Sequence, residues 1–159
     1  MEEGAGPKRA MAIPHYFQTS EQTCGAACLR MLFGGIGVNL DEMTIAQRCG
    51  LTPLGCTVQD LVLGAQALGF NAALLGVVGE PAAIAALSND PPFVAMIDLA
   101  SLYSQGPMFQ WHFVVPLTLT GNEVTFHDPA DGPDRRVPLE DFLSGWATAA
   151  YQGVRVWTP

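Results

Sequence analysis

The sequence predicts an α+β fold in which an N-terminal helical half packs against a mainly antiparallel sheet. Patterns typical of helices cluster in the first half of the chain, and patterns typical of strands cluster in the second half. Of the 159 residues, 49% are hydrophobic and only 14% are charged, which is enough apolar material for one core. We expect residues 1–12 to form a flexible arm and residues 13–159 to form a single domain.

The first predicted helix begins at Cys24 and runs to about Phe33. Apolar residues recur here at every third or fourth position, and Arg30 is the one charged residue, so the helix should be buried nearly all round. The pair Gly34-Gly35 is expected to end it. Three polar residues before the helix are candidate caps, namely Thr19, Ser20 and Thr23.

Three more helices are predicted in the first ninety residues. They span about 41–49, 58–68 and 81–87. The second of them follows Thr57, whose spacing to Asp60 resembles a capping box. The third begins at a proline, which is common at the first position of a helix.

Strand patterns dominate the rest of the chain. The predicted strands span 70–77, 93–98, 111–120, 123–127 and 154–157. A short helix is expected over 139–147. Two segments have no clear period and are predicted to be loops, namely 99–110 and 128–134.

The formal net charge of −8 argues against two classes of partner. Nucleic-acid affinity depends on Lys and Arg that neutralise phosphates, and anionic membrane surfaces also attract basic segments. The acidic residues are spread along the chain, which is typical of a solvated surface. The sequence contains neither a secretory signal nor a transmembrane span, so we expect a cytoplasmic protein, with signal-independent export as an alternative.

Four cysteines are present, and in the cytosol they should be reduced thiols. Their spacing is not that of paired Cys-x-x-Cys zinc ligands. We therefore expect no metal and no cofactor. The oligomeric state is left open.

Cys24 is the candidate nucleophile, because it stands at the predicted start of a helix. The partial positive charge at a helix N-terminus favours the anionic thiolate. Gly25, the next residue, has no side chain and is expected to let a substrate backbone approach closely. The other three cysteines, Cys28, Cys49 and Cys56, are interpreted as small buried residues.

Two polar residues far downstream can complete a catalytic set with Cys24. His112 opens an apolar strand, and Asp128 ends the next strand. A thiol at a helix start, a histidine on a strand and a carboxylate after it supply a nucleophile, a base and a group that orients the base. Gln18 lies six residues before Cys24, on the loop that leads into the helix.

In order and spacing, these residues resemble the papain-like cysteine peptidases, and most closely the bacteriocin-leader (double-glycine) peptidases. The similarity extends from Ile13 to Trp146. The matching segments are Gln18 with its spacing to Cys24, residues 24–29, Gly55, Thr57, Asp60-Leu61, residues 68–70, residues 112–115, Asp128-Pro129, Phe142-Leu143 and Trp146. Because no transmembrane or ATPase segment follows, the chain resembles the stand-alone members of this group.

The resemblance implies a role for each site residue. Cys24 would be the nucleophile, His112 the general base and acid, and Asp128 the residue that orients the imidazole. Gln18 would donate to the oxyanion together with the backbone N–H of Cys24. The implied substrate is a peptide or protein, cut after a small residue such as glycine.

Two other functions are compatible with the sequence. The same three residues could carry out another acyl transfer, such as deamidation, transglutamination or peptide-thiol transfer. A non-catalytic peptide-binding module is the third hypothesis, although such a module has no need of Cys24.

The hairpin between the two long strands sets a condition for this triad. A regular two-residue turn at Gly121-Asn122 would place His112 on the same face as His127 and not as Asp128. An odd loop or a β-bulge would shift the pairing by one residue, and Asp128 would then lie diagonally from His112 on the same face. The triad therefore requires an odd loop or a bulge.

Other polar residues are interpreted as structural. His15 and His127 are expected to be ordinary core histidines, and Gln22 is expected to belong to the helix start and not to the oxyanion site. Four charged residues are expected in a solvated loop: Asp131, Asp134, Arg135 and Arg136. The segment 99–110 precedes His112 and is predicted to form one wall of the substrate cleft.

Overall fold

The computed structural model of this chain describes residues 12–103 and 110–159. Within these residues, six strands form one antiparallel sheet in the order β1-β6-β2-β3-β4-β5. The strands are β1 (Asn71–Leu74), β2 (Val94–Asp98), β3 (Trp111–Thr120), β4 (Glu123–Asp128), β5 (Gly132–Pro138) and β6 (Gly153–Trp157). The helices are α1 (Cys24–Ile36), α2 (Glu42–Arg48), α3 (Val58–Ala67), α4 (Glu80–Asn89), α5 (Leu99–Leu102) and α6 (Leu139–Thr148).

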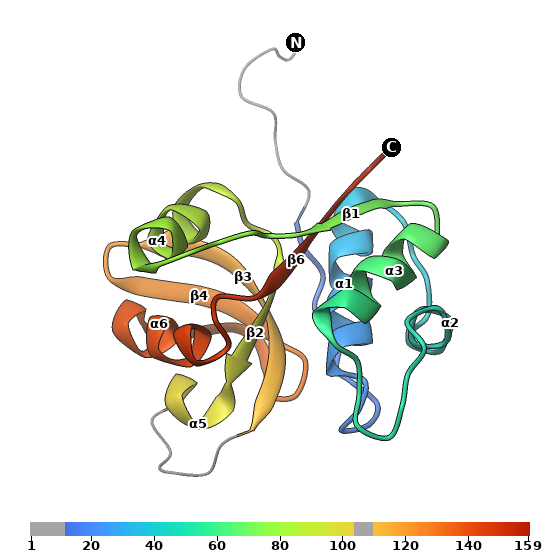
Figure 1. Cartoon of the computed structure of the whole chain (residues 1–159), viewed down its shortest axis with the longest axis horizontal. Coiled ribbons are helices and arrows are strands. Elements are labelled where there is room, and N and C mark those ends of the chain that lie inside the picture. Colours follow the sequence, from blue (N-terminus) through green and yellow to red (C-terminus); the bar gives the residue numbers. More distant parts are fainter. Residues whose placement is uncertain (1–11, 104–109) are drawn as a thin grey trace.

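The first three helices lie together on one side of the molecule, whereas α4, α5 and α6 lie around the sheet on the other side (Figure 1). This arrangement confirms the predicted α+β fold with a helical N-terminal half. Residues 1–11 of the predicted arm and residues 104–109 of the predicted cleft wall lie outside the described residues. Among the helices of the described part, none combines the length and the apolar character that a membrane span requires.

Two buried clusters stabilise the fold, one on each side of the central strands. The first surrounds α1, where Phe33 is fully buried and stacks on Phe70 with ring centroids 4.1 Å apart. The second lies under α4 and α6 and centres on Trp146. Strand β3 contributes to both, because Val114 belongs to the second cluster and its neighbours Phe113 and Val115 belong to the first.

Helix α1 is longer than predicted. It continues through Gly34 and Gly35 to Ile36, and it ends at Gly37, which has φ 95°. The two glycines are needed for packing and not for termination. A Cβ atom at Gly34 would lie only 2.5 Å from Pro14 Cγ, because the segment that leads from residue 12 toward the site crosses the helix there.

Two predicted loops contain regular structure. The segment 99–110 begins with α5, capped by Asp98, whose carboxylate accepts a hydrogen bond from the backbone N–H of Ala100. The segment 128–134 turns directly into β5, which begins at Gly132 and includes three of the four charged residues assigned to a solvated loop. These residues are exposed as expected, but they lie on an edge strand, where charged side chains hide the strand pattern.

A β-bulge in the hairpin of β3 and β4 places Asp128 on the same face of the sheet as His112. The turn at Gly121-Asn122 has two residues, since Thr120 pairs with Glu123. The register then shifts between Pro116 and Thr118, so that Val115 pairs with His127. Proline has no backbone N–H to donate to a ladder, and within a sheet it is accommodated at bulges. The predicted need for an odd loop or a bulge is thus confirmed, and Asp128 lies on the face of His112.

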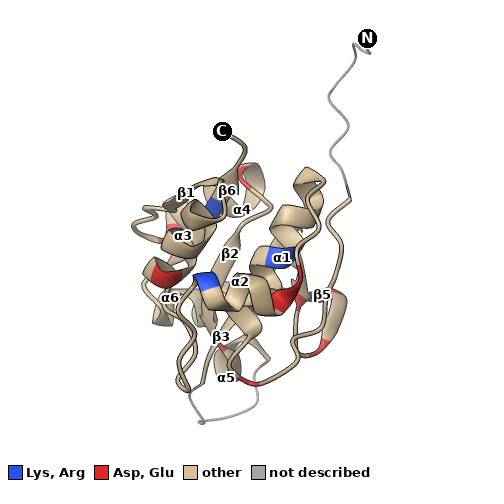
Figure 2. Ribbon diagram, turned by 90° about the vertical axis from the view of Figure 1, so that its right-hand side faces the viewer, with Lys and Arg blue, Asp and Glu red and all other residues tan. Residues whose placement is uncertain are grey.

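The helices predicted over 41–49 and 58–68 are also present. The side chain of Asp41 caps α2, and Thr57 and Asp60 form the predicted capping box at α3. Figure 2 shows acidic and basic residues spread over several elements, and α2 carries both signs, with Glu42 in its first turn and Arg48 in its last.

Candidate active site

Cys24 is the first residue of α1 and is half-buried. The preceding residue, Thr23, is the N-cap, but its side chain does not cap the helix. Its hydroxyl donates instead to the carbonyl of Ser20, at 3.0 Å. The backbone N–H groups of the first turn therefore receive no side-chain partner and stay available to a negative charge beside the thiol.

His112 lies at the start of β3 with only 4% of its surface exposed. Its Nε2 donates to Asp128 Oδ1 at 2.7 Å, which leaves Nδ1 for the thiol of Cys24. Burial disfavours the charged imidazole, but hydrogen bonds with Asp128 and Cys24 outweigh burial and raise the pKa of His112 to about 9. The ring is therefore protonated near neutral pH and can balance a thiolate.

Asp128 ends β4 and is 1% exposed. Its Oδ1 accepts hydrogen bonds from His112 and from the backbone N–H of Ala130, at 2.8 Å. Burial favours the neutral acid, but hydrogen bonds outweigh it and lower the pKa of Asp128 below its ordinary value. The structure thus brings Cys24, His112 and Asp128 together, as the sequence predicts.

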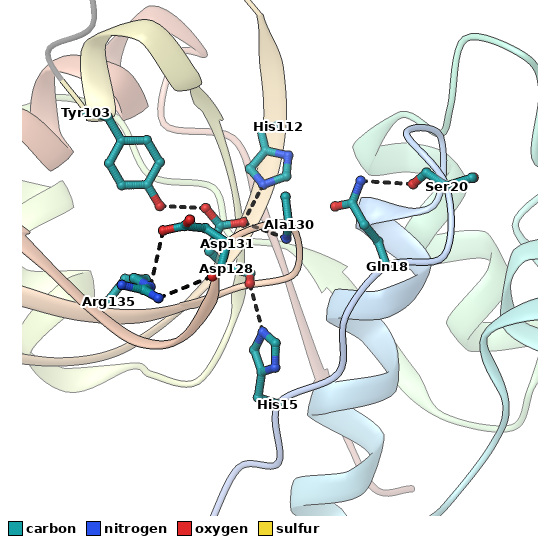
Figure 3. Close-up of polar contacts among 9 residues, drawn as sticks. All are labelled: His15, Gln18, Ser20, Tyr103, His112, Asp128, Ala130, Asp131 and Arg135. Carbon is teal, nitrogen blue, oxygen red and sulfur yellow. Dashed lines mark hydrogen bonds and ion pairs between the residues drawn. The ribbon is translucent and has the colours of Figure 1, made fainter.

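Tyr103 completes the hydrogen bonding of Asp128, and the sequence analysis missed it. Its hydroxyl donates to Asp128 Oδ2 at 2.5 Å (Figure 3). Burial, and then the hydrogen bond to the carboxylate, raise the pKa of Tyr103, so the phenol stays protonated as a donor. The residue lies at the C-cap of α5, within the segment predicted as a loop, and no motif in the sequence points to it.

Gln18 is held by both halves of the molecule. Its backbone N–H donates to the carbonyl of Pro129, at 2.9 Å, next to Asp128 in the chain. Its side-chain Nε2 donates to Ser20 O, also at 2.9 Å, and Oε1 is buried without a partner in the described residues. One N–H of the carboxamide is therefore used within the loop, and the second makes no hydrogen bond with the described residues.

The residues interpreted as structural have structural partners. His127 Nε2 donates to Ile13 O and His15 Nε2 donates to Asp128 O, each at 2.8 Å. Both histidines attach the segment before Gln18 to the end of β4 (Figure 3 shows His15). At Gly25 an added Cβ would meet Leu61 at 3.0 Å, so core packing gives a second reason for glycine here, and the close approach of a substrate backbone stays a prediction.

The four cysteines are free thiols. Cys28 is fully buried and Cys49 nearly so, which agrees with a packing role, whereas Cys56 is half-buried. Within the described residues, no group of three or more His, Cys, Asp or Glu side chains could hold a metal ion.

This geometry has the parts that acyl transfer through a thiol requires. A thiol at a helix start faces a protonated imidazole, a buried carboxylate fixes the ring, and backbone N–H groups lie beside the thiol. The set is assembled across the boundary between the helical half and the sheet, because Cys24 belongs to α1 while His112 and Asp128 belong to neighbouring strands.

Known proteins resemble the chain over most of its length. Residues 12–151 match the model of the peptidase C39 family. Two curated Escherichia coli proteins are each 28% identical: the colicin V secretion/processing ATP-binding protein CvaB over 146 residues and the probable microcin-H47 secretion/processing ATP-binding protein MchF over 145 residues. The alignments cover 89% and 91% of this chain, but the chain spans only 18% of the length of each relative.

Solved structures share the fold. The peptidase domain of Streptococcus ComA aligns with a TM-score of 0.75 at 19% identity, covering 93% of this chain and all of that one. A double glycine motif protease from an AMS/PCAT transporter, in complex with its leader peptide, aligns at 0.74 and 20% identity, covering 96% of each chain. From the match over residues 12–151, we conclude that the chain belongs to the peptidase C39 family and is a cysteine peptidase.

Proposed function

We propose that the chain hydrolyses a peptide bond of a polypeptide substrate, with Cys24 as nucleophile, His112 as general base and acid, and Asp128 as the residue that orients the imidazole. The observation that carries this proposal is the direct bond from His112 Nε2 to Asp128 Oδ1, at 2.7 Å, with the other side of the ring turned to Cys24. This geometry fixes which nitrogen of His112 exchanges a proton with the thiol and with the substrate.

The reaction has two halves. The thiolate of Cys24 attacks the scissile carbonyl carbon, and the oxyanion that forms is stabilised by the backbone N–H of Cys24 and the free N–H of the Gln18 carboxamide. The imidazolium of His112 then gives its proton to the leaving amine, which leaves an acyl-thioester on Cys24. In the second half, His112 takes a proton from water while the water oxygen attacks the thioester; the C–S bond then breaks, the carboxylic acid leaves, and Cys24 returns to the thiolate beside protonated His112.

The substrate class is a second part of the proposal. A solved relative of this fold is a double glycine motif protease bound to a leader peptide, and two curated relatives are secretion/processing proteins. We infer that this chain cuts a leader-type peptide after a small residue such as glycine. The single-domain organisation and the cytoplasmic location expected from the sequence stay predictions.

A defined peptide assay tests the proposal. The substrate is a synthetic peptide with a leader segment, a Gly-Gly junction and a short cargo, and products are identified by mass spectrometry. We expect two fragments from cleavage after the second glycine, and no cleavage by Cys24→Ala or His112→Ala. A peptide with leucine in place of the second glycine is the matched substrate control.

Two outcomes would refute parts of the proposal. An intact peptide with a mass increase of one unit would indicate deamidation in place of hydrolysis. Equal cleavage of the glycine and leucine peptides would leave the peptidase activity in place but would contradict the preference for a small residue.

A further inference from the structure

A buried carboxylate lies behind the loop that carries Gln18. Glu42 is the first residue of α2 and is 5% exposed. It is not needed to cap its own helix, because Asp41 accepts the hydrogen bond from Thr44 N at 2.7 Å. The Glu42 side chain reaches instead to the loop before Cys24.

Thr19 is the partner of this carboxylate. The backbone N–H of Thr19 points between the two oxygens, at 3.3 Å from each, and the Thr19 hydroxyl donates to Oε2. Within residues 12–103 and 110–159, no Lys or Arg pairs with Glu42. A buried carboxylate without a cation costs free energy, and an apolar residue at such a position is often as stable or more stable. Stability alone is therefore a poor explanation for Glu42.

The bond to Thr19 acts directly on Gln18. The N–H that Glu42 holds belongs to the peptide group between Gln18 and Thr19, so it fixes the rotation after the Gln18 Cα. The N–H of Gln18 itself is held by Pro129 O at 2.9 Å, which fixes the rotation before this Cα. With both flanking peptide groups held, the Gln18 side chain can leave the backbone in only one direction.

We propose that Glu42 is a positioning residue for the oxyanion donor, acting on Gln18 through Thr19. This inference rests on the role of Gln18 in the proposed function. Oxyanion donors work because they are already in place when charge develops, and a misplacement of about 1 Å can cost up to about 100-fold in rate. Glu42 supplies this placement from α2, outside the catalytic set.

The test uses Glu42→Gln, which keeps the shape of the side chain but puts an NH₂ group where one of the two oxygens accepts from Thr19. We expect kcat on the Gly-Gly peptide to fall by roughly 10-fold, with KM changed by less than about 2-fold, because the donor acts on the transition state. The same substitution is then made in a Gln18→Ala background. There it should change kcat by less than about 2-fold, since its target is gone.

The control variant is Asp41→Ala. It removes the cap of the same helix without touching Thr19, so it reports the effect of a weakened α2 alone. We expect kcat to stay within about 2-fold of the wild type in this variant. If Asp41→Ala lowers kcat as much as Glu42→Gln, the positioning role is overturned.

Two further results would overturn the inference. They are an unchanged kcat in Glu42→Gln, and a 10-fold loss that persists in the Gln18→Ala background. Should Glu42→Gln fail to fold, Glu42→Asp replaces it in the same cycle and is judged by the same criteria, because it keeps the charge but is one methylene too short to hold the backbone N–H of Thr19 in the same place. A wild-type chain that cleaves no peptide would refute the proposed function itself, whereas a loss in Gln18→Ala but not in Glu42→Gln would refute only this inference.

Discussion

The hydroxyl of Tyr103 donates to Asp128 Oδ2 at 2.5 Å, while His112 donates to Asp128 Oδ1 at 2.7 Å. The carboxylate is thus held from both sides, and its plane cannot turn without breaking one of the two bonds. Because Asp128 binds the His112 ring, Tyr103 acts on the orientation of this ring indirectly, through Asp128 (Figure 3). This relation links the α5 segment to the reacting groups.

Tyr103→Phe tests this link. The variant removes one donor to a charged group, and such bonds contribute about 1.5–3 kcal/mol. We expect the free energy of unfolding to fall by about 1–2 kcal/mol, because water can replace part of the bond at this half-exposed position, and kcat/KM to fall roughly 3–10-fold. Denaturant titration and peptide cleavage measure the two effects. Tyr151→Phe, which changes a tyrosine packed on Trp146, should leave kcat/KM unchanged; an equal loss in both variants would contradict a role through Asp128.

The pH dependence of cleavage follows from His112, whose folded pKa of about 9 lies above its ordinary value of 6.5. The protonated ring is the partner of the thiolate, so kcat/KM should be high at neutral pH and should fall as pH rises through about 9. The stability that this proton contributes is fully present below pH 6.5 and is lost between 6.5 and about 9. A pH profile of cleavage and pH-dependent denaturation measure the two effects.

Asp128→Asn is the variant that checks this assignment. Removal of the carboxylate charge should lower the pKa of His112 and move the alkaline limb of the activity profile to lower pH. An alkaline limb that stays at the same pH in Asp128→Asn would mean that another group titrates there.

Thiol labelling should separate the cysteines. Cys24 is half-buried beside a protonated imidazole and should react with iodoacetamide near pH 7, whereas burial raises the pKa of Cys28 and should leave it unlabelled. Cys56 serves as an internal control, because a hydrogen bond from Cys49 lowers its pKa and it is partly exposed. In His112→Ala we expect slower labelling of Cys24 but not of Cys56, as measured by peptide mapping. Equal rates at Cys24 in both proteins would indicate that His112 does not activate it.

The sequence predicted most of what depends on local chemistry. The start of α1 at Cys24 and the capping box at Thr57 follow from patterns within a few residues, and the structure contains both. The triad was predicted from the order of Cys24, His112 and Asp128 along the chain. Whether Asp128 lies on the same face of the sheet as His112 depended on the register of the hairpin. Pro116 carried the missing signal, since a proline inside a long strand favours a bulge at that place.

What the sequence could not predict depends on contacts between distant segments. Tyr103 and Asp128 are 25 residues apart, and Thr19 and Glu42 are 23 apart, so neither pair forms a motif. The strand β5 was missed because its exposed charged residues conceal alternation. The end of α1 was misplaced because Gly34-Gly35 reads as a stop signal locally, whereas in the fold it accommodates Ile13 and Pro14.

We expect Gly34→Ala to lower the stability of the protein, although this substitution usually stabilises a helix. Replacing glycine by alanine within a helix normally stabilises it by about 0.5–1 kcal/mol. Here the new Cβ would lie 2.5 Å from Pro14 Cγ, and overpacking of this kind costs about 1–3 kcal/mol. The clash should win, so we expect the free energy of unfolding to fall by about 1–2 kcal/mol.

The same clash should also lower activity, because the displaced segment leads to His15, which holds the carbonyl of Asp128, and then to Gln18. Pro14→Ala removes the Cγ atom that the new Cβ would meet. If the clash is the cause, the double variant Gly34→Ala, Pro14→Ala should be more stable than the sum of the two single changes predicts, by about 1 kcal/mol, and should recover most of the cleavage rate. Strict additivity in denaturant titrations would instead place the cost of Gly34→Ala inside α1, and the segment before Gln18 would then not depend on the glycine.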